Sequence, residues 1–206
     1  MKLRMKILKS AVMPLLLAGL LAACASPVPA PVLLTLPPAA AAVASAAPGA
    51  STSAPLLAVR RVNIPEYLVA RRVRYRADAS TLAEWPNTFW AERIEIGVSR
   101  EFVSALRQQL PGWALCDTNC GDPVPALSLQ VDLVPMDYVR STRRLQARAR
   151  IVLSSGATPA RELKTLALNY ELAATGDTAQ AHAQAISELI RQVAQAAAPL
   201  VSDAPR

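Results

Sequence analysis

Apolar and polar residues alternate along three segments in the second half of the chain. Apolar side chains occupy every second position over 127–133, 145–153 and 166–172, and most of the positions between them are polar. A period of two buries one face of each segment and leaves the other in water, as in the strands of an antiparallel sheet. We therefore predict three consecutive strands here.

A four-residue spacing of large apolar side chains between 90 and 110 predicts a helix instead. The segment 86–88, Pro-Asn-Thr, has the residues of a helix start, and Pro111-Gly112 has those of a helix end. The β-branched residues and the glycine within 94–98 leave a strand followed by a helix as an alternative.

A second helix is predicted near the end of the sequence. Asp177-Thr178 offers a capping residue, and Pro199 marks the expected end. The apolar side of this helix consists of Ile186, Leu189, Ile190, Val193, Ala197 and Leu200.

Shorter apolar stretches at 31–36, 57–64 and 68–76 are further strand candidates. The order of all these segments predicts an α+β fold. We expect an antiparallel sheet of about four to five strands, with two helices packed on one face.

The first 24 residues have the pattern of an export signal. Four basic residues among the first nine precede an apolar stretch at 11–21, which is too short to span a membrane. The stretch ends in Leu21-Ala22-Ala23-Cys24, which resembles the lipobox of bacterial lipoproteins, although an ordinary signal with a chance cysteine is an alternative. The resemblance implies cleavage before Cys24 and acylation of its thiol and of the new amino group.

A lipobox divides the chain into four parts. These are a signal peptide (1–23), an Ala/Pro-rich tether (24–55) with a candidate strand at 31–36, a folded domain (56–201) and a tail (202–206). Ala25, rather than Asp, follows the cysteine, so the resemblance implies an anchor in the periplasmic face of the outer membrane.

Removal of the signal changes the charge of the protein. The 206-residue chain has 22 Lys and Arg against 15 Asp and Glu, a formal net charge of +7. The signal contains four of the basic residues and no acidic residue, so the mature chain has 18 cations and 15 anions, or +3. Such a small charge argues against nucleic acid as a partner.

Residues that could perform catalysis are few. His182 is the only histidine and lies in an Ala-rich helix, which indicates an exposed or partly buried helix residue. Glu92 and Glu95 are one helical turn apart, but arginines lie nearby, so we interpret them as surface or helix-terminus charges. The sequence has no glycine motif for a nucleotide and too few His and Cys for a metal cluster. We expect neither an enzyme nor a cofactor.

Cys116 and Cys120 are the two cysteines outside the lipobox, in the sequence Cys-Asp-Thr-Asn-Cys. In an oxidising compartment, such a pair is expected to form a structural disulfide. A redox site is the alternative, but it typically has a Cys-x-x-Cys spacing at the start of a helix.

Arginines form two groups in the sequence. The first consists of Arg60, Arg61, Arg71, Arg72, Arg74 and Arg76, and the second of Arg140, Arg143, Arg144, Arg148 and Arg150. Guanidinium groups bind phosphate and carboxylate with two parallel hydrogen bonds. The first group is therefore a candidate contact for a partner or for lipid head groups, and a solvated sheet face is the alternative.

The order of several short motifs resembles one known family. A lipobox and a short apolar strand precede Pro65, Tyr67 and Leu68, then an Arg-Val-Arg-Tyr-Arg strand at 72–76, and then Trp90-Ala91-Glu92. This order is similar to that of the ABC-type transport auxiliary lipoprotein family. In that resemblance, Pro65, Tyr67, Leu68, Trp90, Ala91 and Glu92 are residues that define the fold. The stretch 37–54 and the pair Cys116/Cys120 depart from the family pattern.

The resemblance implies a role without catalysis. Relatives are outer-membrane lipoproteins that work with MCE-domain proteins and a permease to move lipids between two membranes. It implies an MCE-domain partner of a PqiB-like system and outer-membrane lipid bound through the acylated Cys24. It also implies either a ring-like homo-oligomer or docking around a ring. An assembly factor or plug for an outer-membrane β-barrel is the alternative.

Overall fold

The computed structural model describes residues 29–38, 54–117, 120–121 and 124–204. Every described element lies within the unit Val32–Arg206. The strands are β1 (Val32–Leu34), β2 (Leu56–Val59), β3 (Arg72–Arg76), β4 (Leu82–Trp90), β5 (Ala114–Cys116), β6 (Leu127–Val139), β7 (Arg144–Ser155) and β8 (Glu162–Ala173). The helices are a short 3₁₀ turn η1 (Glu66–Leu68), α2 (Ile94–Gln109) and α3 (Ala179–Ser202).

These strands form one mixed sheet. Strands β6, β7 and β8 are an antiparallel meander, as the alternating pattern predicts. On its other side, β6 pairs in parallel with β2 near its start and with β3 at its last residue. Parallel pairs also join β2 to β5 and β1 to β4, whereas β3 and β4 are antiparallel. The prediction of four to five antiparallel strands is therefore wrong, because the sheet has eight strands and mixed directions.

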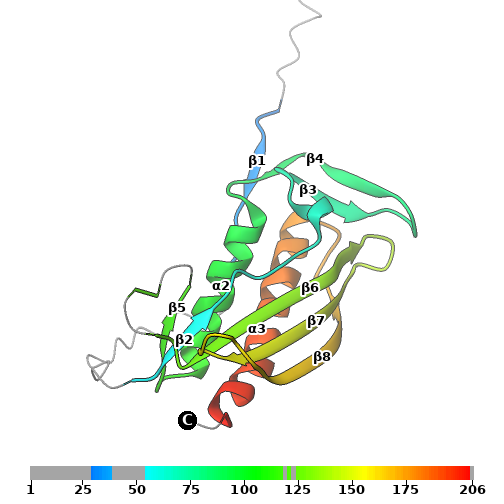
Figure 1. Cartoon of the computed structure of the whole chain (residues 1–206). Helices are drawn as coiled ribbons and strands as arrows, with labels where there is room; N and C mark the ends of the chain where they lie inside the picture. Colours follow the sequence, from blue (N-terminus) through cyan, green and yellow to red (C-terminus); the bar gives the residue numbers. More distant parts are fainter. Residues whose placement is uncertain (1–28, 39–53, 118–119, 122–123, 205–206) are drawn as a thin grey trace, which may run out of the picture. The chain divides into compact units, whose positions relative to one another are not determined.

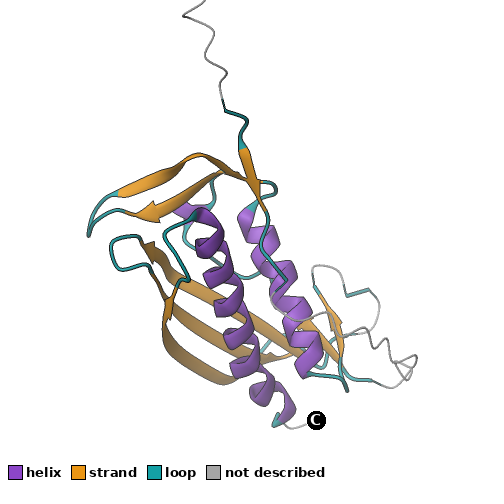
Figure 2. Cartoon of the chain, turned by 180° about the vertical axis from the view of Figure 1, so that it is seen from behind, coloured by secondary structure: helices purple, strands orange, loops and turns teal. Residues whose placement is uncertain are grey.

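Helices α2 and α3 lie side by side across one face of the sheet (Figures 1 and 2), as predicted. Their apolar sides pack on the inward residues of β6 and β7 to form one core. The fully buried members include Leu129, Leu133, Ile151, Leu153, Val98, Phe102, Leu106, Leu189 and Val193. Small alanines complete the buried side of α3, so a core with few aromatic residues still fills the space between the two layers.

A bulge changes which residues of β6 face the core. Up to Leu133 the buried residues have odd numbers, but after the bulge the buried residues are Met136 and Tyr138. Val134 and Pro135 between them are exposed. Proline cannot donate to the strand ladder, so it is tolerated where the pairing is interrupted. The bulge brings the Tyr138 ring into the core, which simple alternation did not predict.

The predicted helix start at 86–88 is wrong. These residues lie inside β4, and α2 begins only at Ile94. The register between β3 and β4 is irregular here, and Asn87 has a φ of 48°. Residues such as Pro and Asn are common both in β-bulges and at helix starts, because the backbone at both places departs from regular strand dihedral angles. The alternative of a strand followed by a helix is closer to the structure, although the strand β4 ends at Trp90, before the residues 94–98 that suggested it.

Helix α3 begins as predicted, since the Thr178 hydroxyl accepts a hydrogen bond of 3.1 Å from the Ala181 amide. Its predicted end at Pro199 is wrong, because the helix continues to Ser202. Pro199 removes only the hydrogen bond to the Gln195 carbonyl. Both residues lie on the exposed side of the helix, where a carbonyl without a helical partner is accessible to solvent.

Candidate functional site

The predicted disulfide is present in the structure. Cys116, the last residue of β5, is bonded to Cys120, with 5.2 Å between their Cα atoms. Cys24, the predicted lipid attachment site, and the signal peptide lie outside the described residues. The lipid anchor therefore remains a prediction from the sequence.

The first arginine group divides between two places in the fold. Arg60 and Arg61 follow β2, whereas Arg71, Arg72, Arg74 and Arg76 lie beside or within β3. Arg60 donates to the Ser128 hydroxyl at 3.4 Å. Arg72 and Arg74 share one carboxylate, since each lies 3.3 Å from an oxygen of Glu84 on β4. The six arginines therefore do not form one cluster. Only the four beside or within β3 are neighbours in the fold as well as in the sequence.

Arg76 belongs to a cluster that joins three elements. Its Nε lies 3.0 Å from Asp137 Oδ2 on β6, and the Tyr67 hydroxyl donates to Asp137 Oδ1 at 2.9 Å. The Arg76 guanidinium also lies over the Tyr67 ring, at 5.7 Å from its centroid. Partial burial and the bond to Asp137 raise the pKa of Tyr67, and the same carboxylate raises the pKa of Arg76. This network holds the η1 turn against the sheet.

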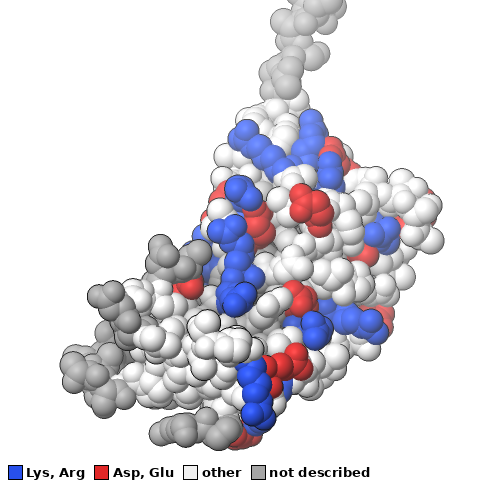
Figure 3. Space-filling model, in the orientation of Figure 1, with Lys and Arg blue, Asp and Glu red and all other residues white. Residues whose placement is uncertain are grey.

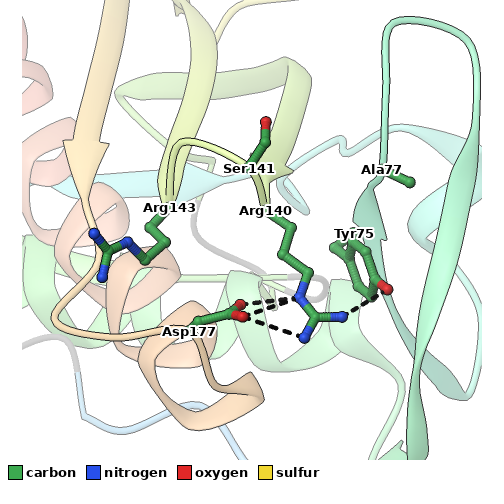
Figure 4. A pocket seen from close by; sticks show the side chains of 6 residues that line it. All are labelled: Tyr75, Ala77, Arg140, Ser141, Arg143 and Asp177. Carbon is green, nitrogen blue, oxygen red and sulfur yellow. Dashed lines mark hydrogen bonds and ion pairs between the residues drawn. The ribbon is translucent and has the colours of Figure 1, made fainter.

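A surface pocket of about 630 Å³ lies beside this network. Its central side chain is Arg140, which donates to both oxygens of Asp177 and, at 2.9 Å, to the Tyr75 hydroxyl (Figure 4). The guanidinium also stacks 4.4 Å from the Trp85 ring centroid. Hydrogen bonds to Asp177 and Tyr75 raise the pKa of Arg140. Arg143, at the other side of the pocket, points away from this pair (Figure 4).

The Arg140 pocket was not predicted from the sequence. Its partners Tyr75 and Asp177 are 65 and 37 residues away in the chain, and no motif connects them. Because Arg140 is already held by a carboxylate, a hydroxyl and two rings, it stabilises the turn between β6 and β7. An anion would have to compete with Asp177 for it.

The other arginines of the second group project from β7. Arg144 pairs with Glu171 at 3.5 Å, and Arg148 donates to the Asn169 amide oxygen at 3.3 Å. Together with Arg150 they lie on the face opposite the helices, where the alternate residues of β7 are exposed. These arginines of β7 therefore lie on a solvated sheet face, which was the alternative to a contact with a partner or with head groups.

His182 is buried, so the expectation of an exposed or partly buried position is wrong. It is 4% exposed and stacks on the Tyr138 ring at 4.5 Å, with the edge of Trp90 at 6.4 Å. Burial lowers its pKa from 6.5 to about 3, so the imidazole is neutral. Among the described residues, its Nδ1 has no hydrogen-bond partner. The ring contacts with Tyr138 and Trp90 are those of a core aromatic residue.

The Trp90-Ala91-Glu92 motif connects β4 to α2. Trp90 is 5% exposed, and the Ala91 amide donates to the Leu34 carbonyl at 2.8 Å, which continues the pairing with β1. Glu92 accepts two hydrogen bonds from Arg100 on α2. Glu95 is 6% exposed, lies in the first turn of α2 and contacts Arg93, so it is a helix-terminus charge, one of the two positions predicted. A pocket of about 400 Å³ borders this connection and includes Arg71 and Arg93 at its wall.

The described residues hold no group of three or more His, Cys, Asp or Glu side chains placed to bind a metal ion. In the same part of the chain, neither helix combines the length and the apolar character that a membrane crossing requires.

Two solved structures share this fold. An uncharacterized protein is 17% identical, with a TM-score of 0.66, and the match covers 84% of this chain and 99% of that one. Protein XCC0632 from Xanthomonas campestris, assigned to the family DUF330, is 14% identical, with a TM-score of 0.57 over 84% and 92% of the two chains. No curated protein sequence matches the chain significantly.

The comparison of sequences assigns the class of protein more closely than the comparison of folds does. The model of the ABC-type transport auxiliary lipoprotein component matches residues 34–198, which include every strand and helix except the start of β1 and the last turn of α3. The chain belongs to this family. It is therefore an auxiliary lipoprotein component of ABC-type transport, as the motif order indicated.

Proposed function

We propose that this protein is the outer-membrane lipoprotein of an MCE-type intermembrane lipid transport system. It docks the periplasmic conduit to the outer membrane and performs no catalysis. The observation that carries the proposal is the family match over 34–198, because it assigns an accessory role in transport to the whole folded domain. The sequence Leu21-Ala22-Ala23-Cys24-Ala25 supports an outer-membrane anchor.

The partner in this proposal is an MCE-domain protein of a PqiB-like system. MCE assemblies are rings, so the lipoprotein is expected either to form a ring-like homo-oligomer that matches their symmetry or to dock around the ring.

Affinity purification of the acylated protein from membranes, followed by mass spectrometry, tests the proposal. An MCE-domain protein and its permease should be recovered with it. The matched control is a Cys24→Ser variant, which keeps the folded domain but removes the attachment site. A β-barrel protein recovered without any MCE component would contradict the proposal and favour an assembly factor for that barrel.

A further inference from the structure

One end of the sheet has an exposed apolar surface next to arginines. Leu33 on β1 is in register with Phe89 on β4, and Phe89 is in register with Arg72 on β3. Directly paired residues lie on the same face of a sheet, so these three side chains are neighbours. The guanidinium groups of Arg72 and Arg71 lie 5.0 and 5.9 Å from the Phe89 ring centroid. We call Leu33, Phe89, Arg71 and Arg72 the β1 patch.

This patch is open on the side that faces away from the core. Leu33 is 55% exposed, whereas the next residue, Leu34, is 8% exposed and belongs to the core. Successive residues of a strand face opposite sides of the sheet, so Leu34 faces the core and Leu33 faces away from it. Leu33 is therefore a large apolar side chain that presents more than half of its surface to solvent.

In two ion pairs near the patch, the arginine is more exposed than its carboxylate partner. The side chain of Arg72 is 50% exposed and that of its partner Glu84 is 35% exposed. For Arg93 and Glu95 the values are 67% and 8%. Figure 3 shows basic side chains gathered at this end of the domain. An anionic surface would meet guanidinium groups before it met the carboxylates.

The length of the chain places this end near the lipid anchor. Val32 is eight residues after Cys24. A chain extends at most about 3.6 Å per residue, so β1 lies within about 29 Å of the acylated cysteine. The folded domain, whatever its orientation, is held to the membrane through β1.

We propose that the β1 patch lies on the anionic phospholipid head groups of the membrane that holds Cys24. The proposal rests on the acylation of Cys24 in the proposed function. Leu33 and Phe89 enter the interface between head groups and acyl chains, and Arg71 and Arg72 bind phosphate oxygens. Stacking on Phe89 orients the two guanidinium groups. The bilayer, rather than a protein, is the occupant in this proposal because the chain between Cys24 and β1 lets the patch lie no farther than about 29 Å from the lipid anchor.

The test uses the full acylated protein with one fluorescent label. Acylation blocks Cys24 and the disulfide occupies the other two cysteines, so Leu33→Cys introduces the only free thiol. An environment-sensitive label is attached there, and the protein is reconstituted in vesicles of phosphatidylethanolamine and phosphatidylglycerol that contain a brominated quencher lipid. Gln195→Cys is the matched label site. It is exposed and lies 13 residues beyond His182 on α3, about 20 Å farther along the helix from β4.

We expect the label at 33 to be quenched and the label at 195 to stay unquenched. The double variant Arg71→Gln/Arg72→Gln should lower the ratio of docked to undocked protein by more than about tenfold, because each basic residue adds to the attraction of an anionic surface. The control Arg148→Gln/Arg150→Gln removes the same charge from the outer face of β7 and should leave the quenching unchanged. Unfolding curves of both double variants show whether the domain remains folded.

Three results would overturn the proposal, and each has a different cause. If the protein floats with the vesicles while both labels stay unquenched, the anchor is present and the patch does not dock. If the protein does not float and its N-terminal peptide has no acyl mass, the proposed anchor itself fails. If the label at 33 is shielded in detergent micelles in a concentration-dependent way, a second copy of the chain covers the patch.

Discussion

At the scale of single residues, burial in the core sets the protonation state of His182, the only histidine in the sequence. The folded protein holds His182 neutral, because its pKa falls from 6.5 to about 3 in the core. Between those two values the unfolded chain binds a proton that the folded chain excludes. The free energy of unfolding therefore decreases as the pH falls through this range.

We predict that His182→Met weakens this pH dependence. From pH 7 to pH 5 the histidine accounts for a loss of about 2 kcal/mol in the free energy of unfolding, because its unfolded pKa is near 6.5. Urea unfolding at several pH values measures the loss in both proteins. Tyr138→Phe is the control, since it changes the same ring stack but removes no group that titrates there. An equally steep dependence in His182→Met would show that other groups cause it.

The Tyr67 hydroxyl provides a second prediction at this scale. Tyr67→Phe removes the donor to Asp137 and leaves Arg76 as its partner, so the free energy of unfolding should fall by about 1 kcal/mol. Tyr170→Phe is the control, because the Tyr170 ring packs on the core from β8 and its hydroxyl makes no side-chain hydrogen bond within the part of the chain that the structure describes. Equal effects of the two substitutions in chemical denaturation would contradict a role for the Tyr67–Asp137 bond.

At the scale of the elements, sequence patterns predicted the regular parts of this fold. Strict alternation identified β6 to β8, and the four-residue stripe identified the buried face of α2. Neither pattern could predict β5 or the parallel pairings, because a three-residue strand has too few positions to show a period and its partner is set by tertiary contacts. The Arg140 pocket likewise depends on tertiary contacts, since its residues come together only when β3, the β6–β7 turn and the start of α3 meet.

A close approach between elements depends on one glycine. At Gly156, just after β7, an added Cβ would lie 1.6 Å from the Pro125 carbonyl oxygen, which precedes β6. We predict that Gly156→Ala lowers the free energy of unfolding by about 1–3 kcal/mol, because backbone must move to admit the methyl group. Gly176→Ala, where nothing lies within 4 Å, is the matched control and should cost far less in thermal denaturation. Similar melting temperatures for the two variants would contradict the close approach.

At the scale of the whole molecule, a single cysteine is expected to decide where the domain resides. The domain belongs to a lipoprotein family. Attachment in our proposal therefore depends on acylated Cys24. Several acyl chains anchor a protein firmly, whereas a single chain gives only reversible binding, because each buried CH₂ contributes about 0.8 kcal/mol.

A Cys24→Ser variant exported behind a signal peptide that is cleaved without acylation should therefore move from the membrane fraction to the soluble periplasmic fraction, with its unfolding curve unchanged. The double variant Cys116→Ser/Cys120→Ser is the converse control. It opens a five-residue loop, which costs about 2 kcal/mol by chain entropy, but keeps the anchor, so it should remain with membranes. Fractionation with immunodetection measures the location, and mass spectrometry of the N-terminal peptide measures acylation. A Cys24→Ser protein that stays with the membranes after a high-salt wash would show that the folded domain binds them without lipidation, and the acyl chains would then only add to an affinity that the protein surface already provides.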